Sequence, residues 1–170
     1  GGGACNCGTI YKLDSAGHET LLHAFSGGAD GAYPATDLLA DKAGNFYGTT
    51  RFGGSSNAGM VFRLAPDNTK TVLYNFLGTN DGGAPQSGVI ADRLGNLYGT
   101  TELGGGKDAG VVYRLAPDGS ETVLYSFTGG TDGNEPYGGL FAGKKKELYG
   151  TTTSGGTNGL GTIFEVSSKS

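Results

Sequence analysis

A four-residue segment, Tyr-Gly-Thr-Thr, occurs three times in this chain at a constant interval of 51 residues. Its copies begin at equivalent tyrosines, Tyr47, Tyr98 and Tyr149. The sequence between the copies aligns without an insertion or a deletion, and such self-similarity is typical of solenoids, propellers and other repeat architectures. We therefore expect one tandem-repeat domain over residues 1–170. Its parts are expected at 8–58, 59–109 and 110–160, with an extra terminal strand at 161–166.

The composition indicates a folded chain that is rich in turns. It has 35 glycines in 170 residues but only 16% charged side chains, which is too few for a disordered, solvated tail. The glycines do not recur at every third residue, which excludes a collagen helix. The net charge of -4 makes a nucleic-acid partner unexpected. No apolar run approaches the ~20 residues of a membrane span, so membrane insertion is not expected either.

The first repeat contains four short runs of strand-forming residues, separated by turn residues. The runs lie at 9–13, 20–25, 37–40 and 45–50. Pairs such as Asp30-Gly31 mark the turns, and alternation in the first run predicts a buried Tyr11. Four short antiparallel strands in about 50 residues match one blade of a β-propeller. The predicted fold class is therefore all-β, with tandem four-stranded antiparallel sheets of the propeller type.

Differences between the repeats are conservative at the predicted core positions. Tyr11 corresponds to the aromatic residues Phe62, Tyr113 and Phe164. Ile10 corresponds to the β-branched residues Val61, Val112 and Ile163. Exchanges of this kind preserve side-chain volume and strand propensity, as expected for a packed β core.

Four motifs repeat in phase along the whole chain. They are G-N-L-Y-G-T-T, then G-G, then G-x-[VI]-[FY]-[KR]-L, then T-V-L-Y-x-F-x-G-x-x-D-G-x-x-P. This pattern resembles the glycine-rich GloVer tandem repeat of bacterial surface proteins. The segment 91–101 is also similar to the strand pair of regulator-type and NHL-type propeller blades. The resemblance implies an exported, often surface-associated repeat protein with no established catalytic role.

The two ends of the chain predict incomplete sheets. Residues 8–13 and 161–166 occupy the same place in the repeat, which gives thirteen expected strands. Closed propellers usually have about 4–8 blades, so three blades are not expected to close alone. Exposed strand edges tend to pair, and we expect a homo-oligomer or a head-to-tail assembly, either closed or filamentous. Alternatively, the chain is a piece of a longer propeller.

The recurring carboxylates are interpreted first as turn residues. Asp30, Asp81 and Asp132 are each followed by glycine and then by proline. They are also the candidates for calcium ligands, although no alternating oxygen ligands or downstream bidentate glutamate accompany them. Equivalent aspartates on separate blades would lie too far apart for a glycosidase pair, which needs about 5–10 Å. We therefore predict no metal site.

The two cysteines, Cys5 and Cys7, lie just before the first predicted strand. An intramolecular or intermolecular disulfide in an oxidising compartment is the favoured interpretation. Zinc would need two further ligands, and the histidines are His18 and His23. Since His23 replaces a tyrosine of the other repeats, a packing role is expected for it. The basic run at 144–146 is interpreted as a solvated turn.

Residues that differ between repeats and lie in loops are the candidates for a ligand site. They occupy three sets of equivalent positions: Tyr33, Ala84 and Glu135; Ala35, Gln86 and Tyr137; Arg51, Glu102 and Thr153. Of these, Tyr33, Arg51 and Tyr137 could present aromatic rings and donors to a glycan. Unselected surface variation is the alternative.

The sequence therefore leaves several functions open. The first is a secreted, non-enzymatic structural protein that assembles with itself at the bacterial surface. The second is a multivalent carbohydrate-binding propeller, with surface glycans as partners. An extracellular glycan-active enzyme is a distant third, because no serine or threonine lies in a strand-to-helix elbow. No cofactor is expected.

Overall fold

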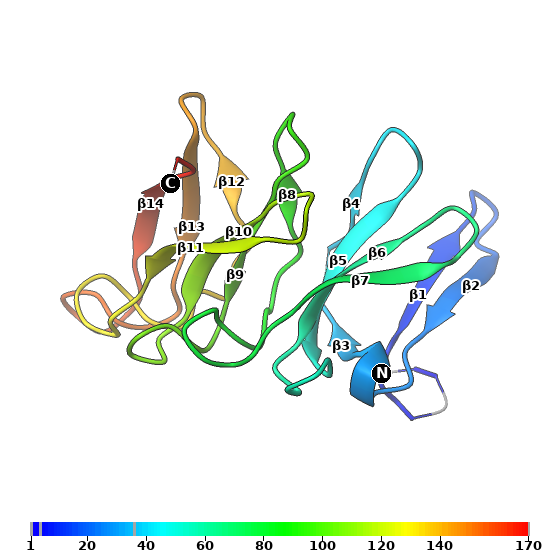
Figure 1. The fold of residues 1–170 in the computed structure, drawn as a ribbon, viewed down its shortest axis with the longest axis horizontal. Helices are drawn as coiled ribbons and strands as arrows, with labels where there is room; N and C mark the ends of the chain where they lie inside the picture. The colour runs from blue at the N-terminus through cyan, green and yellow to red at the C-terminus, as the bar shows by residue number, and fades with distance from the viewer. Residues whose placement is uncertain (1, 4, 36, 170) are drawn as a thin grey trace.

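The computed structural model describes residues 2–3, 5–35 and 37–169, and these residues form an all-β structure. Apart from one short 3-10 turn, Gly28–Asp30, the regular elements described are strands. The strands pair antiparallel and form four sheets that follow one another side by side (Figure 1). The prediction of an all-β fold with antiparallel sheets is confirmed. The prediction of four strands in each sheet holds for only one of the four sheets described, since the others have two, three and five strands.

We number the sheets 1 to 4 in chain order. Sheet 1 contains β1 (Thr9–Leu13) and β2 (Glu19–Ala24). Sheet 2 contains β3 (Ala32–Pro34), β4 (Leu39–Ala40), β5 (Phe46–Phe52), β6 (Met60–Leu64) and β7 (Lys70–Asn75). Sheet 3 contains β8 (Ile90–Ala91), β9 (Leu97–Thr101), β10 (Val111–Leu115) and β11 (Glu121–Ser126). Sheet 4 contains β12 (Phe141–Ala142), β13 (Glu147–Thr151) and β14 (Ile163–Ser167).

The sheets do not coincide with the repeats expected from the sequence. The first two runs of the repeat at 8–58 form β1 and β2 in sheet 1, whereas its last two form β4 and β5 in sheet 2. The physical reason is the short connection from β5 to β6, which pairs Gly48 with Phe62 across the repeat boundary. A sheet therefore combines the second half of one repeat with the first half of the next. Sheets 1 and 4 lie at opposite ends of the row, and the described strands do not close into a ring (Figure 1).

The pairing register recurs from sheet to sheet. An aromatic residue lies opposite a glycine in the three pairs Gly48–Phe62, Gly99–Tyr113 and Gly150–Phe164. The ring covers the glycine so closely that a Cβ at Gly48 would lie 2.8 Å from Phe62 Cζ. A β-bulge lies just before the aromatic residue in β6 and β10, and β1 has the equivalent bulge. Glycine is thus required where the neighbouring ring lies over the backbone.

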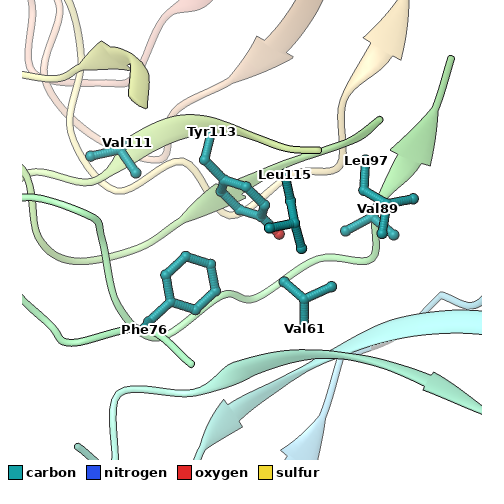
Figure 2. Packing of buried hydrophobic residues seen from close by; sticks show 7 residues of the cluster. All are labelled: Val61, Phe76, Val89, Leu97, Val111, Tyr113 and Leu115. Atoms are coloured by element: carbon teal, nitrogen blue, oxygen red, sulfur yellow. The ribbon is translucent and has the colours of Figure 1, made fainter. Parts of the chain in front are cut away.

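The core lies between consecutive sheets. The rings of Phe76 and Tyr113 meet edge to face, with their centroids 5.1 Å apart, and connect sheet 2 to sheet 3. Figure 2 shows this cluster, in which Val61 of β6 lies across from Leu115 of β10. Equivalent edge-to-face pairs connect the other sheets: Phe25 with Phe62 and Phe127 with Phe164.

The prediction of a buried Tyr11 is wrong. Tyr11 is 52% exposed, whereas the equivalent Phe62 and Tyr113 are 0% exposed. These two rings pack against a phenylalanine of the preceding sheet, and no sheet precedes sheet 1 within the described residues. The buried residue of this strand is Ile10, which packs in a cluster with Phe62 of sheet 2.

The described part of the chain contains no helix that is long and apolar enough to cross a membrane.

Candidate functional site

Three of the variable residues, one in strand β5 and two in loops, donate hydrogen bonds to the carboxylate of a fourth, Glu102. Glu102 follows β9 directly, and only 8% of its surface is exposed. Its Oε2 accepts hydrogen bonds from Arg51 Nη2 at 2.9 Å and from Gln86 Nε2 at 2.5 Å. Its Oε1 accepts a hydrogen bond from Tyr137 Oη at 2.8 Å. We call Arg51, Gln86, Glu102 and Tyr137 the Glu102 cluster.

The loops that precede β8 and β12 position this cluster. Thr49 Oγ1 in β5 donates to the carbonyl of Ser87 at 2.7 Å, which holds the loop of Gln86 against sheet 2. Thr100 Oγ1 in β9 donates to the carbonyl of Gly138 at 3.2 Å, which holds the loop of Tyr137 against sheet 3. Each loop is therefore anchored to the preceding sheet. This arrangement brings residues of three repeats into contact.

A second set of variable residues shares a strained backbone. Tyr33, Ala84 and Glu135 have φ angles of 56°, 52° and 56°, in the left-handed region that costs a residue with a side chain about 1 kcal/mol. Each backbone N–H donates to a carbonyl of an earlier segment: Tyr33 to Cys7, Ala84 to Ala58 and Glu135 to Ala109. These hydrogen bonds offset the strain. The position is thus structural in all three repeats, even though its side chain varies.

One nitrogen of the half-exposed Arg51 side chain is left without a hydrogen-bond partner in this cluster. Arg51 Nε is buried and has no hydrogen-bond partner among the described residues. The guanidinium of Arg51 lies over the ring of Phe52, 5.1 Å from its centroid. The hydrogen bond to Glu102 and partial burial raise the pKa of Tyr137, so it remains a neutral donor at physiological pH.

The structure brings two of the three predicted ligand residues together. Arg51 and Tyr137 contact the same carboxylate. Tyr33 does not contact this carboxylate. Its ring packs edge to face on Phe52, with the centroids 5.8 Å apart, and Phe52 in turn lies under the guanidinium of Arg51. Tyr33 is 58% exposed. The central role of Glu102 was missed from the sequence. A signal existed, because Arg51 and Glu102 carry opposite charges at equivalent positions of consecutive repeats.

The three candidate calcium ligands lie in equivalent turns. The Oδ2 atoms of Asp30, Asp81 and Asp132 each accept a backbone N–H at 2.8 Å. A second donor reaches each carboxylate: Lys70 for Asp30, Tyr74 for Asp81 and Tyr125 for Asp132. The described residues contain no group of three or more His, Cys, Asp or Glu residues that could hold a metal ion.

Asp30 differs from the other two aspartates because two basic side chains, Lys70 and His23, contact its carboxylate. Burial opposes ionisation, but the hydrogen bond from Lys70, the N–H of Ser26 and the charges of Lys70 and His23 lower the pKa of Asp30 to about 2. His23 Nε2 lies 3.1 Å from Asp30 Oδ1, and its ring packs edge to face on Phe25. His23 therefore contributes to a turn and to packing.

The two cysteines form a disulfide in the structure. Cys5 and Cys7 are bonded to each other just before β1. The other histidine, His18, is exposed and pairs with Asp14 at 3.0 Å. The cysteines and the two histidines thus lie in three separate local arrangements.

The family model described as the Gloeobacter/Verrucomicrobia repeat matches residues 1–170. The comparison with curated proteins found no match.

Proposed function

Because the chain belongs to the Gloeobacter/Verrucomicrobia repeat family over residues 1–170, we propose that it is a non-enzymatic structural module of the bacterial exterior that associates with its own copies. Its sheets act as propeller-like blades in this proposal. The observation that carries it is the exposure of apolar side chains on both terminal sheets. In sheet 1, Tyr11, Leu13 and Leu21 are exposed. At sheet 4, Leu160 and Ile163 are exposed by 86% and 83%.

These exposed surfaces are those that interior sheets bury against each other. Val61 and Val112 occupy the same strand position as Ile163 and are 0% exposed, because the next sheet covers them. Phe62 and Tyr113 occupy the position of Tyr11 and contact the preceding sheet. Sheet 4 of one copy therefore offers the surface that sheet 1 of another copy fits. Such a contact is heterologous, and it forms a closed ring or a filament according to the rotation between copies.

The expected affinity is moderate. Burial of one large apolar side chain contributes about 1.5–3 kcal/mol, whereas association costs about 4–15 kcal/mol. Several side chains must therefore be buried together for a stable contact. We expect a dissociation constant on the order of 1 μM.

Sedimentation velocity across a concentration series, combined with electron microscopy, tests this proposal. Wild-type protein should form larger species as its concentration rises, and Ile163→Asp should remain monomeric. Leu77→Asp is the matched control, since Leu77 is also exposed but lies outside the terminal sheets. Monomers at every wild-type concentration, or equal loss of assembly in both variants, would contradict the proposal.

The disulfide supports the part of this proposal that places the protein outside the cell. Disulfides persist in oxidising environments such as the periplasm and the cell exterior. The Cys5–Cys7 bond is therefore consistent with a secreted protein.

A second candidate function is carbohydrate binding at the Glu102 cluster. Arg51 Nε is buried without a partner among the described residues, and the exposed ring of Tyr33 lies beside the cluster through Phe52. A glycan array should then give a signal that Tyr33→Ala lowers about tenfold, the loss expected for about 1.4 kcal/mol of stacking. Phe141→Ala is the control, because Phe141 is also an exposed aromatic residue but lies in β12 of sheet 4, away from Tyr33. An array without signal excludes this function.

A further inference from the structure

A cleft of about 1020 Å³ lies between sheets 3 and 4. Its walls are the turn that connects β8 to β9, the turn that connects β12 to β13, and the residues that follow β14. Five basic side chains line it: Arg93, Arg114, Lys144, Lys146 and Lys169. The whole chain has 12 lysines and arginines and a net charge of -4, so the cleft concentrates positive charge in an acidic protein.

The acidic residues of the cleft are engaged in local hydrogen bonds. Asp92 accepts the N–H groups of Leu94 and Asn96, the amide of Asn96 and the hydroxyl of Tyr98. Glu147 Oε2 accepts the N–H of Lys145 at 2.7 Å. Both carboxylates thus serve to shape the turns that form the walls.

The basic residues, in contrast, are available to a ligand. The ion pairs within the described part of the chain include none of these five side chains. Arg93, Lys144, Lys146 and Lys169 are exposed. Arg114 donates from Nη2 to Thr122 at 3.3 Å, but its Nε is buried without a partner among the described residues.

The turn from β12 to β13 differs from its two equivalents. Gly143 replaces the aspartate that begins the other turns, Asp41 and Asp92. Lys146 replaces Gly44 and Gly95, whose φ angles are 85° and 84°, and it adopts a φ of 71°. A lysine in this left-handed conformation costs free energy that glycine avoids. Compared with the two equivalent turns, this turn therefore lacks a negative charge, has an additional positive charge and carries backbone strain. Strain of this kind points to function.

We propose that this cleft binds an acidic polysaccharide through the carboxylate or sulfate groups of its sugars. Lysine and arginine form charge-assisted hydrogen bonds with such anions. Ile90, Leu94 and Leu148 also line the cleft, and they provide apolar surface for the C–H faces of sugar rings. A nucleic acid fits less well, because binding along its regularly spaced phosphates needs an extended basic face, whereas these five basic side chains are confined to one cleft of a chain with a net charge of -4.

This site is separate from the assembly proposed above. It lies within a single copy, between sheets 3 and 4, and it shares no residue with the Glu102 cluster. Binding is therefore expected in a monomer. It would attach the module to an anionic matrix whether or not copies associate.

Calorimetric titration with polygalacturonate and with heparin, at low and at physiological salt, tests the proposal. Wild-type protein should bind at least one of the two polymers, with an affinity that falls as salt rises. The double variant Lys144→Gln, Lys146→Gly should bind about tenfold more weakly, while its melting temperature does not fall. Lys42→Gln, Lys107→Gln removes the same charge outside the cleft and should leave binding unchanged.

Three results would overturn the proposal. The first is no binding of either polymer at low salt, and the second is an equal loss in the control variant. The third is equally tight binding of duplex DNA, which would make the cleft a general polyanion site. The same titration with Ile163→Asp separates polysaccharide binding from assembly, since that variant is expected to be monomeric and should still bind.

Discussion

Single glycines determine how closely neighbouring strands pack in this protein. Gly99 in β9 lies opposite Tyr113, whose side chain is fully buried. A Cβ at Gly99 would collide with the Tyr113 hydroxyl. We expect Gly99→Ala to lower the free energy of unfolding by about 1–3 kcal/mol, because the ring has no space to move. Urea denaturation measures this change. Gly106→Ala is the control, since a Cβ at Gly106 would meet no atom within 4 Å, and equal losses in both variants would refute the explanation.

Equivalent strands carry opposite charges at the same position. Lys70 begins β7 and pairs with Asp30 at 2.8 Å. Glu121 begins β11, where burial and then the charge of Asp81 raise its pKa to about 7. Its Oε1 is buried and has no hydrogen-bond partner among the described residues. The stabilising ion pair between sheets 1 and 2 thus becomes a repulsive pair of carboxylates between sheets 2 and 3.

This difference predicts that stability falls as the pH rises from about 4.5 to about 7. The pKa of Glu121 is higher in the folded than in the unfolded state, so the folded state binds more protons in this interval and loses stability as they dissociate. We expect a loss of about 1–2 kcal/mol, reduced by the partial exposure of the side chain. Urea denaturation across this interval should show a smaller slope for Glu121→Gln. The equivalent Glu19→Gln is the control, and an unchanged slope in Glu121→Gln would disprove the assignment.

At the scale of the whole molecule, stability depends on contacts between consecutive sheets. In a linear array each unit contacts only its neighbours. Phe76 is 0% exposed and joins sheet 2 to sheet 3 through Tyr113. Phe76→Ala should cost about 3–5 kcal/mol. Hydrogen exchange should show the greatest loss of protection in β6 and β10, which flank this contact. Leu77→Ala, at the exposed next residue, should change stability by less than about 0.5 kcal/mol, and uniform loss along the chain would contradict a local interface.

The candidate site was predictable only in part. Arg51 and Tyr137 were identified because they vary among equivalent loop positions. Their shared contact with Glu102 depends on how β5 and the loops of the following repeats meet, since the three residues come from three repeats. The basic cleft was missed for the same reason, because the run at 144–146 becomes a wall only when Arg93 and Arg114 lie across from it.

The sequence by itself determined most of the strands and their turns, because alternation, glycine and Asp-Gly pairs act over a few neighbouring residues. It did not predict β3 at Ala32–Pro34, which forms only by pairing with β5 of the same sheet. It also determined the family, through motifs that recur in phase. Only the tertiary structure decided which strands share a sheet and which surfaces are buried. Those choices arise from contacts between repeats: the aromatic pairs that bury Phe62 and Tyr113 have no counterpart for Tyr11, although all three occupy the same place in the repeat.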